Sequence, residues 1–397
     1  MNNFVPRLLA LVKVSLALAA ATVLLAGAQV SAQCPGVTTV TAGLRLPLGI
    51  TQSNQDNLLV SETGFGAPGT GRISIVGPGG SRRTLLDGLP SGINDVGDPS
   101  GPAGLSLRGR TLYVAIGVGD VGVAGPIPGT TVPNPNGPSS PLFSSVLAIH
   151  FSAHVEKTTA GFTLTAAQQQ ALAGGQKVTL SNGGGDKITI ELVVDFPNYI
   201  SNPLPFFADN IRLSNPFDLV AVGGQLYVTD GGRNLVWQVD IDSGASSVLA
   251  NFPPLANPLP FGPPFIDAVP TGIAYSDGQL LVTLFRGFPF PPGASEVRAV
   301  DPETGAQAPF ITGRSSAIDV LSFRSKGDTD YLVLEFSADM LAGDPGRLLR
   351  FETPTSTPTV VAGCLITPTS MTLDEKTDTL YVTELGTGRV VSIPVAP

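Results

Sequence analysis

The chain has few charged residues and few of the residues on which most enzymes depend. Charged side chains make up 13% of the 397 residues, about half the usual share, and there are 2 histidines, 2 cysteines and 1 tryptophan. No P-loop, GxSxG or CxxC motif occurs, so the usual signals of phosphate binding, serine hydrolysis and dithiol chemistry are missing. The formal net charge of −9 gives the chain no general attraction for phosphate, and we therefore expect no nucleic-acid partner.

Residues that form turns are abundant instead. Gly (47) and Pro (36) together make up 83 of the 397 residues, without the G-X-Y period of collagen. Hydrophobic residues at 42% and the shortage of charge argue against a disordered chain. This composition is typical of an all-β protein built from many short strands.

The N-terminus has the features of a secretory signal peptide. Arg7 and Lys13 precede an apolar run at 14–28, and the small residues VSA follow at 30–32. We expect residues 1–32 to be removed, which makes the protein secreted or periplasmic. A membrane anchor is one alternative, but the run is shorter than the ~20 residues that a bilayer requires. Lipid attachment at Cys34 is another alternative. No segment after residue 32 is long and apolar enough to span a membrane.

A four-part pattern recurs six times after this segment. Its most regular part is a short apolar strand centred on a valine, at Val60, Val114, Val228, Val282, Val333 and Val382. These valines are 49 to 54 residues apart, except for one gap of 114. A period of about 50 residues with four strands per unit is typical of a β-propeller blade. We therefore predict that residues 33–397 form an all-β, six-bladed propeller.

The two ends of the chain are predicted to complete one blade together. The sixth unit stops after its third strand, at 388–393, while an unassigned strand-like segment lies at 37–44. Pairing of these segments would close the ring and remove two exposed sheet edges. A seventh blade inside the long gap is the alternative, although that stretch has no strand of the recurring kind.

The long gap falls in the second blade and contains an insertion at about 157–192. Residues 120–143 are rich in Gly, Pro and Asn and predict a long loop. A short helix is predicted at 165–175, and a hairpin with a glycine turn at 178–193. We expect both to decorate one face of the blade, either as a partner-binding region or without a function of their own.

Two cysteines in an exported chain suggest a disulfide between Cys34 and Cys364. In an alternating meander these residues fall at opposite ends of their strands, which are about 17 Å long. A bridge needs Cα atoms within about 7 Å, so the N-terminal segment would have to fold back. The paired and unpaired states both remain open. His150 and His154 are expected to be solvated loop residues rather than a metal pair.

Carboxylates occur in two sets. The first lies around the loops that lead into the innermost strands: Asp95, Asp98, Asp209, Asp218, Asp267 and Asp319. Convergent carboxylates suit Ca²⁺, but Asp also holds turns together, and we favour that structural role. The second set ends the valine-centred strands: Glu62, Asp230, Glu335 and Glu384. A catalytic residue is needed only once, so this repetition indicates a scaffold role.

Three loops combine proline with phenylalanine, at 203–210, 258–265 and 285–293. Proline stiffens such loops, and phenylalanine supplies apolar area at low entropic cost. Exposed together, these rings would form a rim that binds a lipid, a pigment or a protein. Folded inward, they would plug the end of the propeller, which is the arrangement that we favour.

Two segments resemble a known family. DAVPTGIAYSDGQLLVTLFRGFPFPPGASEVRAVD at 267–301 and SNPFDLVAVGGQLYVTDGGRNLVWQVD at 214–240 are similar to ScyD/ScyE-type secreted propellers, named from the scytonemin sunscreen gene neighbourhood of cyanobacteria. The resemblance covers most of 37–397 and implies an exported propeller without established catalytic residues. The insertion at 157–192 departs from the shortest members of that family.

Broader relatives of this family are NHL-like and gluconolactonase-like propellers. Lactonases of that kind hold a divalent metal through a Glu, two Asn and an Asp. The resemblance makes Asn94, Asn215 and Asp267 the counterparts of three of these ligands. The start of blade one, at 46–49, contains no Glu.

Our leading hypothesis is a monomeric, exported binding or accessory propeller without catalysis of its own. Its ligand would be a small apolar or aromatic molecule, or a protein partner, bound by Arg286, Phe288, Phe290, Phe206, Phe207 and Phe261. One alternative is a Ca²⁺-dependent lactonase or hydrolase that uses Asn94, Asn215 and Asp267. Another is an extracellular protein-interaction module that uses residues 120–195.

Overall fold

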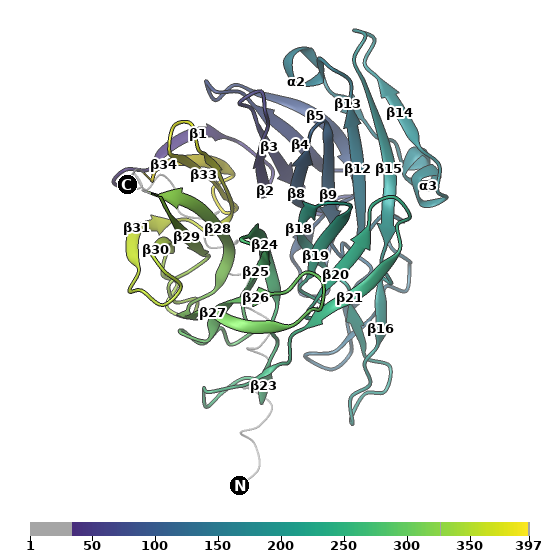
Figure 1. Ribbon diagram of the computed structural model, residues 1–397. Helices are drawn as coiled ribbons and strands as arrows, with labels where there is room; N and C mark the ends of the chain where they lie inside the picture. The colour runs from purple at the N-terminus through teal and green to yellow at the C-terminus, as the bar shows by residue number, and fades with distance from the viewer. Residues whose placement is uncertain (1–33, 326, 396–397) are drawn as a thin grey trace, which may run out of the picture.

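Six antiparallel blades surround a central axis in the computed structural model, which describes residues 34–325 and 327–395 (Figure 1). The predicted six-bladed propeller is therefore confirmed, whereas the predicted signal peptide at 1–32 lies outside the described residues. No helix in the described ranges is long and apolar enough to cross a membrane.

The blades follow one another along the chain, each running from the axis outward. Blade one consists of β2 (Pro47–Gln52), β3 (Leu58–Glu62), β4 (Gly71–Val76) and β5 (Arg82–Leu89); blade two of β8 (Pro102–Arg108), β9 (Thr111–Ile116), β12 (Ser145–Phe151) and β15 (Lys187–Asp195); and blade three of β18 (Pro216–Val222), β19 (Gln225–Asp230), β20 (Leu235–Asp240) and β21 (Ser246–Asn251). Blade four consists of β24 (Pro270–Ser276), β25 (Gln279–Leu284), β26 (Ser295–Val300) and β27 (Gln307–Arg314), and blade five of β28 (Ala317–Ser325), β29 (Asp328–Glu335), β30 (Gly346–Phe351) and β31 (Thr359–Leu365).

Blade six joins the two ends of the chain. Its inner strands are β32 (Pro368–Asp374), β33 (Thr379–Glu384) and β34 (Arg389–Pro394), and its outermost strand is β1 (Thr38–Ala42). β1 and β34 are antiparallel, with Thr38 opposite Ser392 and Ala42 opposite Arg389. The predicted closure by the N-terminal strand is confirmed, and it leaves β34 without an open edge.

Position within a blade explains the hydrophobic pattern of each strand. The second strand lies between two neighbouring blades, so both of its faces are covered, and all five residues of β3 are buried. The outermost strand faces solvent, and in β21 four of six residues are exposed. This is why the continuous apolar runs in the sequence mark the second strands.

Hydroxyl groups on the second strands connect neighbouring blades. The Thr229 hydroxyl donates to the Thr271 carbonyl of blade four, and the Thr283 hydroxyl donates to the Ile318 carbonyl of blade five at 3.2 Å. Ser61 makes the equivalent bond to blade two. Where a small polar residue follows the central valine of the repeat, it therefore satisfies buried backbone at the junction between blades.

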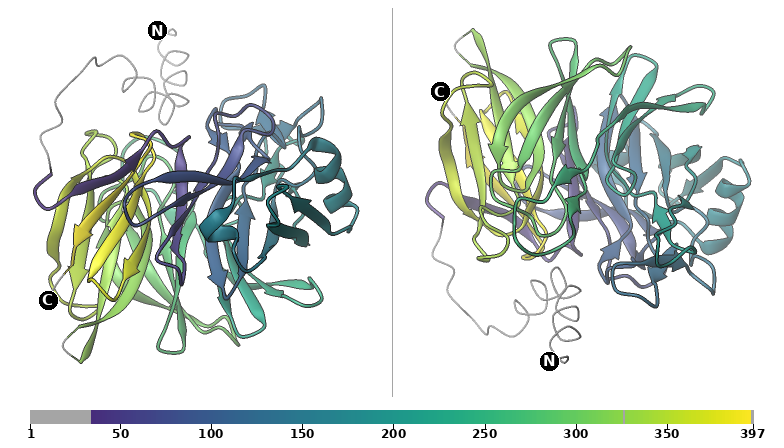
Figure 2. Two further views of the ribbon diagram at one scale, coloured as in Figure 1. Left: turned by 90° about the horizontal axis from the view of Figure 1, so that it is seen from above. Right: turned by 90° about the horizontal axis from the view of Figure 1, so that it is seen from below.

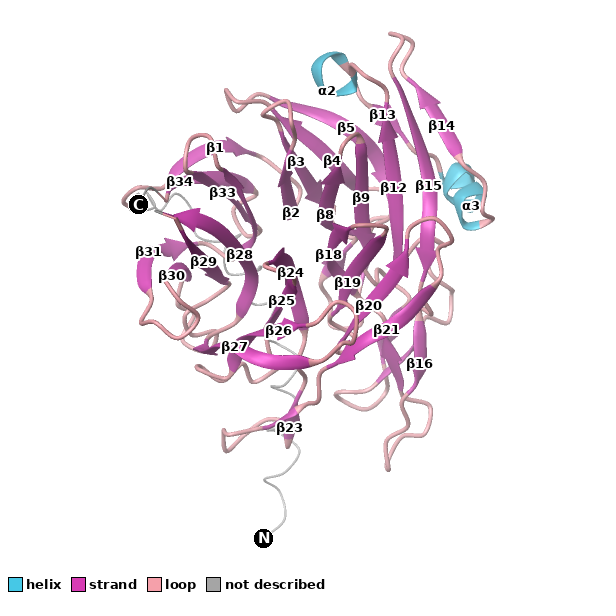
Figure 3. Cartoon of the chain, in the orientation of Figure 1, coloured by secondary structure: helices cyan, strands magenta, loops and turns pink. Residues whose placement is uncertain are grey.

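The insertion joins blades one and two instead of decorating one face. It contains α2 (Val155–Thr158), β13 (Phe162–Thr163), α3 (Ala166–Ala173) and β14 (Val178–Ser181), which lie at the outer edge of the ring (Figure 3). β13 pairs in parallel with β5 of blade one, and β14 pairs with β15. The predicted helix and hairpin exist, but the second strand of the hairpin is the fourth strand of blade two itself.

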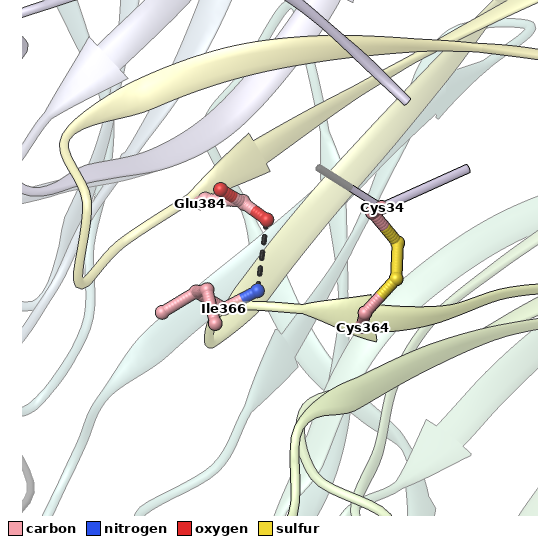
Figure 4. Close-up of a disulfide and its surroundings, with 4 residues drawn as sticks. All are labelled: Cys34, Cys364, Ile366 and Glu384. Atoms are coloured by element: carbon pink, nitrogen blue, oxygen red, sulfur yellow. Dashed lines mark hydrogen bonds between the residues drawn. A yellow bond between two sulfur atoms is a disulfide. The ribbon is translucent and has the colours of Figure 1, made fainter. Parts of the chain in front are cut away.

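The two cysteines form a disulfide with a Cα–Cα distance of 5.7 Å (Figure 4). A turn at 34–37 makes this possible: the Val37 amide donates to the Cys34 carbonyl at 3.0 Å, and Gly36 has a φ of 77°. Glycine tolerates this left-handed conformation. The N-terminal segment therefore folds back toward blade five, which resolves the alternative that the sequence left open.

Candidate functional site

The two faces of the ring carry different loops. Because the strands alternate in direction, the loops between blades share one face with the loops between second and third strands. These loops are long at 63–70, 90–101, 117–144, 196–215, 252–269, 285–294 and 336–345. We call this side the hairpin face. The opposite face consists mainly of short turns, and Figure 2 shows the ring edge-on between the two faces.

Four small hairpins extend the loops of the hairpin face. They are β6 (Gly92–Ile93) with β7 (Pro99–Ser100), β10 (Gly122–Ala124) with β11 (Thr131–Pro133), β16 (Tyr199–Ser201) with β17 (Ile211–Leu213), and β22 (Leu255–Ala256) with β23 (Phe265–Ile266). In Figure 1 the hairpins that carry β16 and β23 extend outward beyond the ring. The loop predicted at 120–143 thus contains a short hairpin of its own.

Exposed apolar side chains gather on the hairpin face. They are Phe65, Ile93, Val96, Tyr199, Ile200, Phe206, Leu255, Phe261, Phe265 and Leu341. Phe206 is 64% exposed and Phe265 is 60% exposed. The other large exposed apolar residues of the described ranges, Val248, Tyr275 and Val360, lie on strands of the blades themselves. A concentration of this kind on one face is typical of an interaction surface.

The phenylalanines predicted to bind a ligand fall into two groups. Phe206 and Phe261 are exposed at the tips of their loops, while Phe207 is half-buried. Phe288 and Phe290 are also half-buried and meet edge to face, with ring centroids 6.0 Å apart. The inward-facing arrangement that we favoured therefore applies to the 285–293 loop, whereas the other two loops present exposed rings.

Arg286, also predicted as a ligand contact, is buried in the structure. Its guanidinium donates to Glu296 at 2.8 Å and to the Ala294 carbonyl at 3.1 Å. Burial lowers the pKa of Arg286, an effect that the charge of Glu296 opposes. Leu284 stands opposite Glu296, where other blades place a carboxylate opposite an arginine. Arg286 thus stabilises its own loop.

The repeated carboxylates at the ends of the second strands hold the adjoining loops. Asp230 accepts the Asn215 and Arg233 amides at 2.7 and 3.0 Å. Glu384 accepts the Ile366 amide at 2.8 Å, as Figure 4 shows, and also binds Arg389. Glu62 and Glu335 make corresponding bonds. All four are fully buried, which supports the scaffold role inferred from their repetition.

The three proposed metal ligands bond to separate groups of the protein. The Asn94 side chain accepts the amides of Val96 and Asp98, at 3.1 and 2.8 Å, within its own turn. The Asn215 side chain accepts the Val118 amide at 3.0 Å. In the described ranges, no group of three or more His, Cys, Asp or Glu residues is arranged to hold a metal ion.

Asp267 is held by two side chains that precede it in the chain. Arg212 donates to its carboxylate at 2.8 Å and Asn234 donates at 2.7 Å. The Asn234 side chain also accepts the Val269 amide at 3.0 Å. These bonds fix the base of the 252–269 loop, so Asp267 has a structural part in supporting the exposed rings of that loop.

Six equivalent positions on the innermost strands line a narrow central cavity that leaves essentially no room for a water molecule. They are Gly49, Gly104, Asp218, Gly272, Asp319 and Ser370. Asp218 accepts the Ile273 amide of blade four at 3.1 Å, and Asp319 accepts the Met371 amide of blade six at 2.8 Å. Each aspartate therefore joins its own blade to the next one. A Cβ at Gly104 would lie 2.2 Å from the Asp218 Oδ1, so glycine makes room for the carboxylate.

Both aspartates of the central cavity are held toward their protonated forms. Burial raises the pKa of Asp218 from 3.8 to about 7. Burial, followed by the charge of Asp218, raises the pKa of Asp319 well above 3.8. The other equivalent positions are glycine or serine, so the lining offers no cation to offset these charges. The pair can hold a proton near neutral pH.

The sequence did not reveal a polar network on blade two. His150 lies within β12, where Nδ1 is 2.9 Å from the Thr111 hydroxyl and Nε2 is 2.8 Å from Glu191. Lys177 pairs with the same glutamate. The prediction of a solvated loop was wrong for His150, because β12 extends through Phe151 and places the ring beside Thr111 on β9.

Comparisons with known proteins find resemblance among solved structures only. No protein-family model and no curated protein matches the chain. A structure described as an oxidoreductase (glucose dehydrogenase) from Thermus thermophilus has a TM-score of 0.49 and 15% identity, covering 90% of this chain and 99% of its own. A gluconolactonase from Xanthomonas campestris has a TM-score of 0.48 and 13% identity, covering 90% and 88%. A virginiamycin B lyase from Staphylococcus aureus has a TM-score of 0.44 and 13% identity, covering 90% and 99%. The similarity to these structures is limited to the overall fold.

Proposed function

We propose that this protein is an exported, non-catalytic binding or accessory propeller of the ScyD/ScyE type, and that its hairpin face binds an apolar or aromatic partner. The observation that carries the proposal is the concentration of exposed large apolar side chains on that face. The partner is a small apolar or aromatic molecule or a larger apolar surface.

The support for the rings at the loop tips suits a binding role. Asn257 donates to the carbonyls of Phe261 and Pro263, at 2.7 and 2.8 Å, within its own loop. The Asn210 side chain joins two hairpins by accepting the Thr131 amide at 2.9 Å and donating to the Asn202 carbonyl at 2.8 Å. Loops held in this way lose little conformational entropy when they bind a partner.

A neutral fluorescent dye, Nile red, tests the apolar face directly. Replacement of Phe206, Phe261 and Phe265 by serine should remove most of the dye fluorescence that the wild-type protein enhances, because these rings supply the exposed apolar area. The matched control replaces Val248 and Val360, exposed by 42% and 54% on outer strands, and should keep the signal. Equal dye binding by both variants would contradict the proposal.

The lactonase alternative has a separate readout. The side chains of Asn215 and Asp267 are already bonded to protein groups, which favours a structural role for them over metal binding. Addition of Ca²⁺ should therefore leave the melting temperature unchanged, and gluconolactone should not be hydrolysed. Ca²⁺-dependent turnover that is lost in Asn215→Ala would replace our proposal with the enzymatic one.

A further inference from the structure

The exposed apolar side chains of the hairpin face are distributed around the propeller. Phe65 lies on a loop of blade one, Phe206 between blades two and three, Phe261 and Phe265 between blades three and four, and Leu341 on a loop of blade five. A rigid protein partner would need a pocket for each of these separated tips. A fluid apolar phase accepts them at any spacing.

The charges of the hairpin face limit the choice of partner. The three hairpins at 90–101, 196–215 and 252–269 contain no lysine or glutamate. Their only arginine, Arg212, is paired with Asp267. No ion pair of the described ranges includes Asp95, Asp98 or Asp209 on these hairpins. Apart from Arg212, these three hairpins carry only acidic charges, which repel anionic lipid and tolerate a neutral or zwitterionic interface.

The opposite face carries charged turns, which suits docking through the hairpin face alone. Its short turns carry charged residues that include Asp56, Asp242, Asp277, Glu303 and Lys376. Such a face stays in water, while the apolar tips of the hairpin face can enter the region between lipid headgroups and acyl chains.

We propose that the hairpin face docks on a zwitterionic lipid surface, with Phe206, Phe261 and Phe265 inserted individually into the interface. The inference rests on the proposed function, because it names the apolar partner of the same face. The ring axis then stands roughly upright on the lipid. Arg286 and the inner rings Phe288 and Phe290 remain in the protein as support.

Flotation with phosphatidylcholine vesicles tests the inference. Wild type should float with the vesicles, and the variant F206S/F261S/F265S should bind roughly tenfold more weakly for each ring that contributes. The control V248S/V360S should float like wild type. All three proteins are tested after removal of residues 1–32, so the apolar run at 14–28 does not contribute to lipid binding. Phosphatidylserine added to the vesicles should not strengthen binding.

Each other outcome overturns the inference. Absence of flotation, equal flotation of the tip variant and the control, or a requirement for phosphatidylserine would each exclude docking on zwitterionic lipid through the tips. Nile red binding that depends on the tips without flotation would preserve the proposed function and refute the lipid surface. Dimers that light scattering detects, and that the tip substitutions abolish, would make a second copy the partner instead.

Discussion

Replacement of Cys34 and Cys364 by alanine should lower the free energy of unfolding by about 5 kcal/mol at most. The disulfide joins residues separated by 330 positions, so it removes a large amount of chain entropy from the unfolded state. It also holds the turn from which β1 enters blade six. Denaturant unfolding of the oxidised wild type and of C34A/C364A measures the difference.

Reduction provides the matched control for this prediction. Treatment with dithiothreitol should bring the wild type to the stability of the variant and leave C34A/C364A unchanged. A difference below about 1 kcal/mol would mean that the backbone pairing of β1 with β34 closes the ring without help, since a typical disulfide contributes 2–4 kcal/mol. The prediction would then be wrong.

Stability should fall as pH rises from about 4 to about 7 because of Asp218 and Asp319. Both pKa values lie above the ordinary value of 3.8, with that of Asp218 at about 7. The folded state therefore keeps protons that the unfolded chain releases in this range, so the unfolded state is favoured increasingly with pH. The shift at Asp218 corresponds to a loss on the order of 4 kcal/mol. Thermal unfolding across this range, compared with D218N/D319N, measures the contribution.

Asparagine is a neutral counterpart of the protonated side chain and can still accept a backbone amide. The double variant should gain stability relative to wild type as pH rises. Asp301 offers a control of opposite sign, because amides of Thr304 and Glu303 lower its pKa. Its replacement by asparagine should cost stability above about pH 4 and not in acid. Parallel pH profiles for wild type and D218N/D319N would refute the role of the pair.

The architecture could be predicted from the sequence because its four-strand unit is repeated. Each second strand is covered on both sides by its neighbours, so six separate segments show the same apolar pattern. One irregular segment therefore does not change the prediction. The strand at 37–44 was identifiable because blade six lacked a fourth strand. The role of β15 was missed because the insertion separates it from β12 by 35 residues (152–186).

The candidate site was less predictable because it depends on contacts between distant loops. Asp267 is held by Arg212 and Asn234, which no local pattern connects to it. In other blades the carboxylate ends the second strand and the arginine lies on the third strand. In blade four the carboxylate, Glu296, lies on the third strand, and Arg286 is buried against it. The conformation of proline-rich loops decides whether Phe206 or Phe288 is exposed, and composition alone predicts both equally.

The closure of blade six has a consequence for biosynthesis. Residues 38–42 are made before their partner at 389–394, and the other five blades lie between them in the chain. Blades one to five contain all of their own strands and can form in chain order, but the earliest strand stays unpaired until β34 is available. Until that pairing forms, proteases can meet a ring of five blades with one loose strand, and full resistance to them requires blade six to be complete.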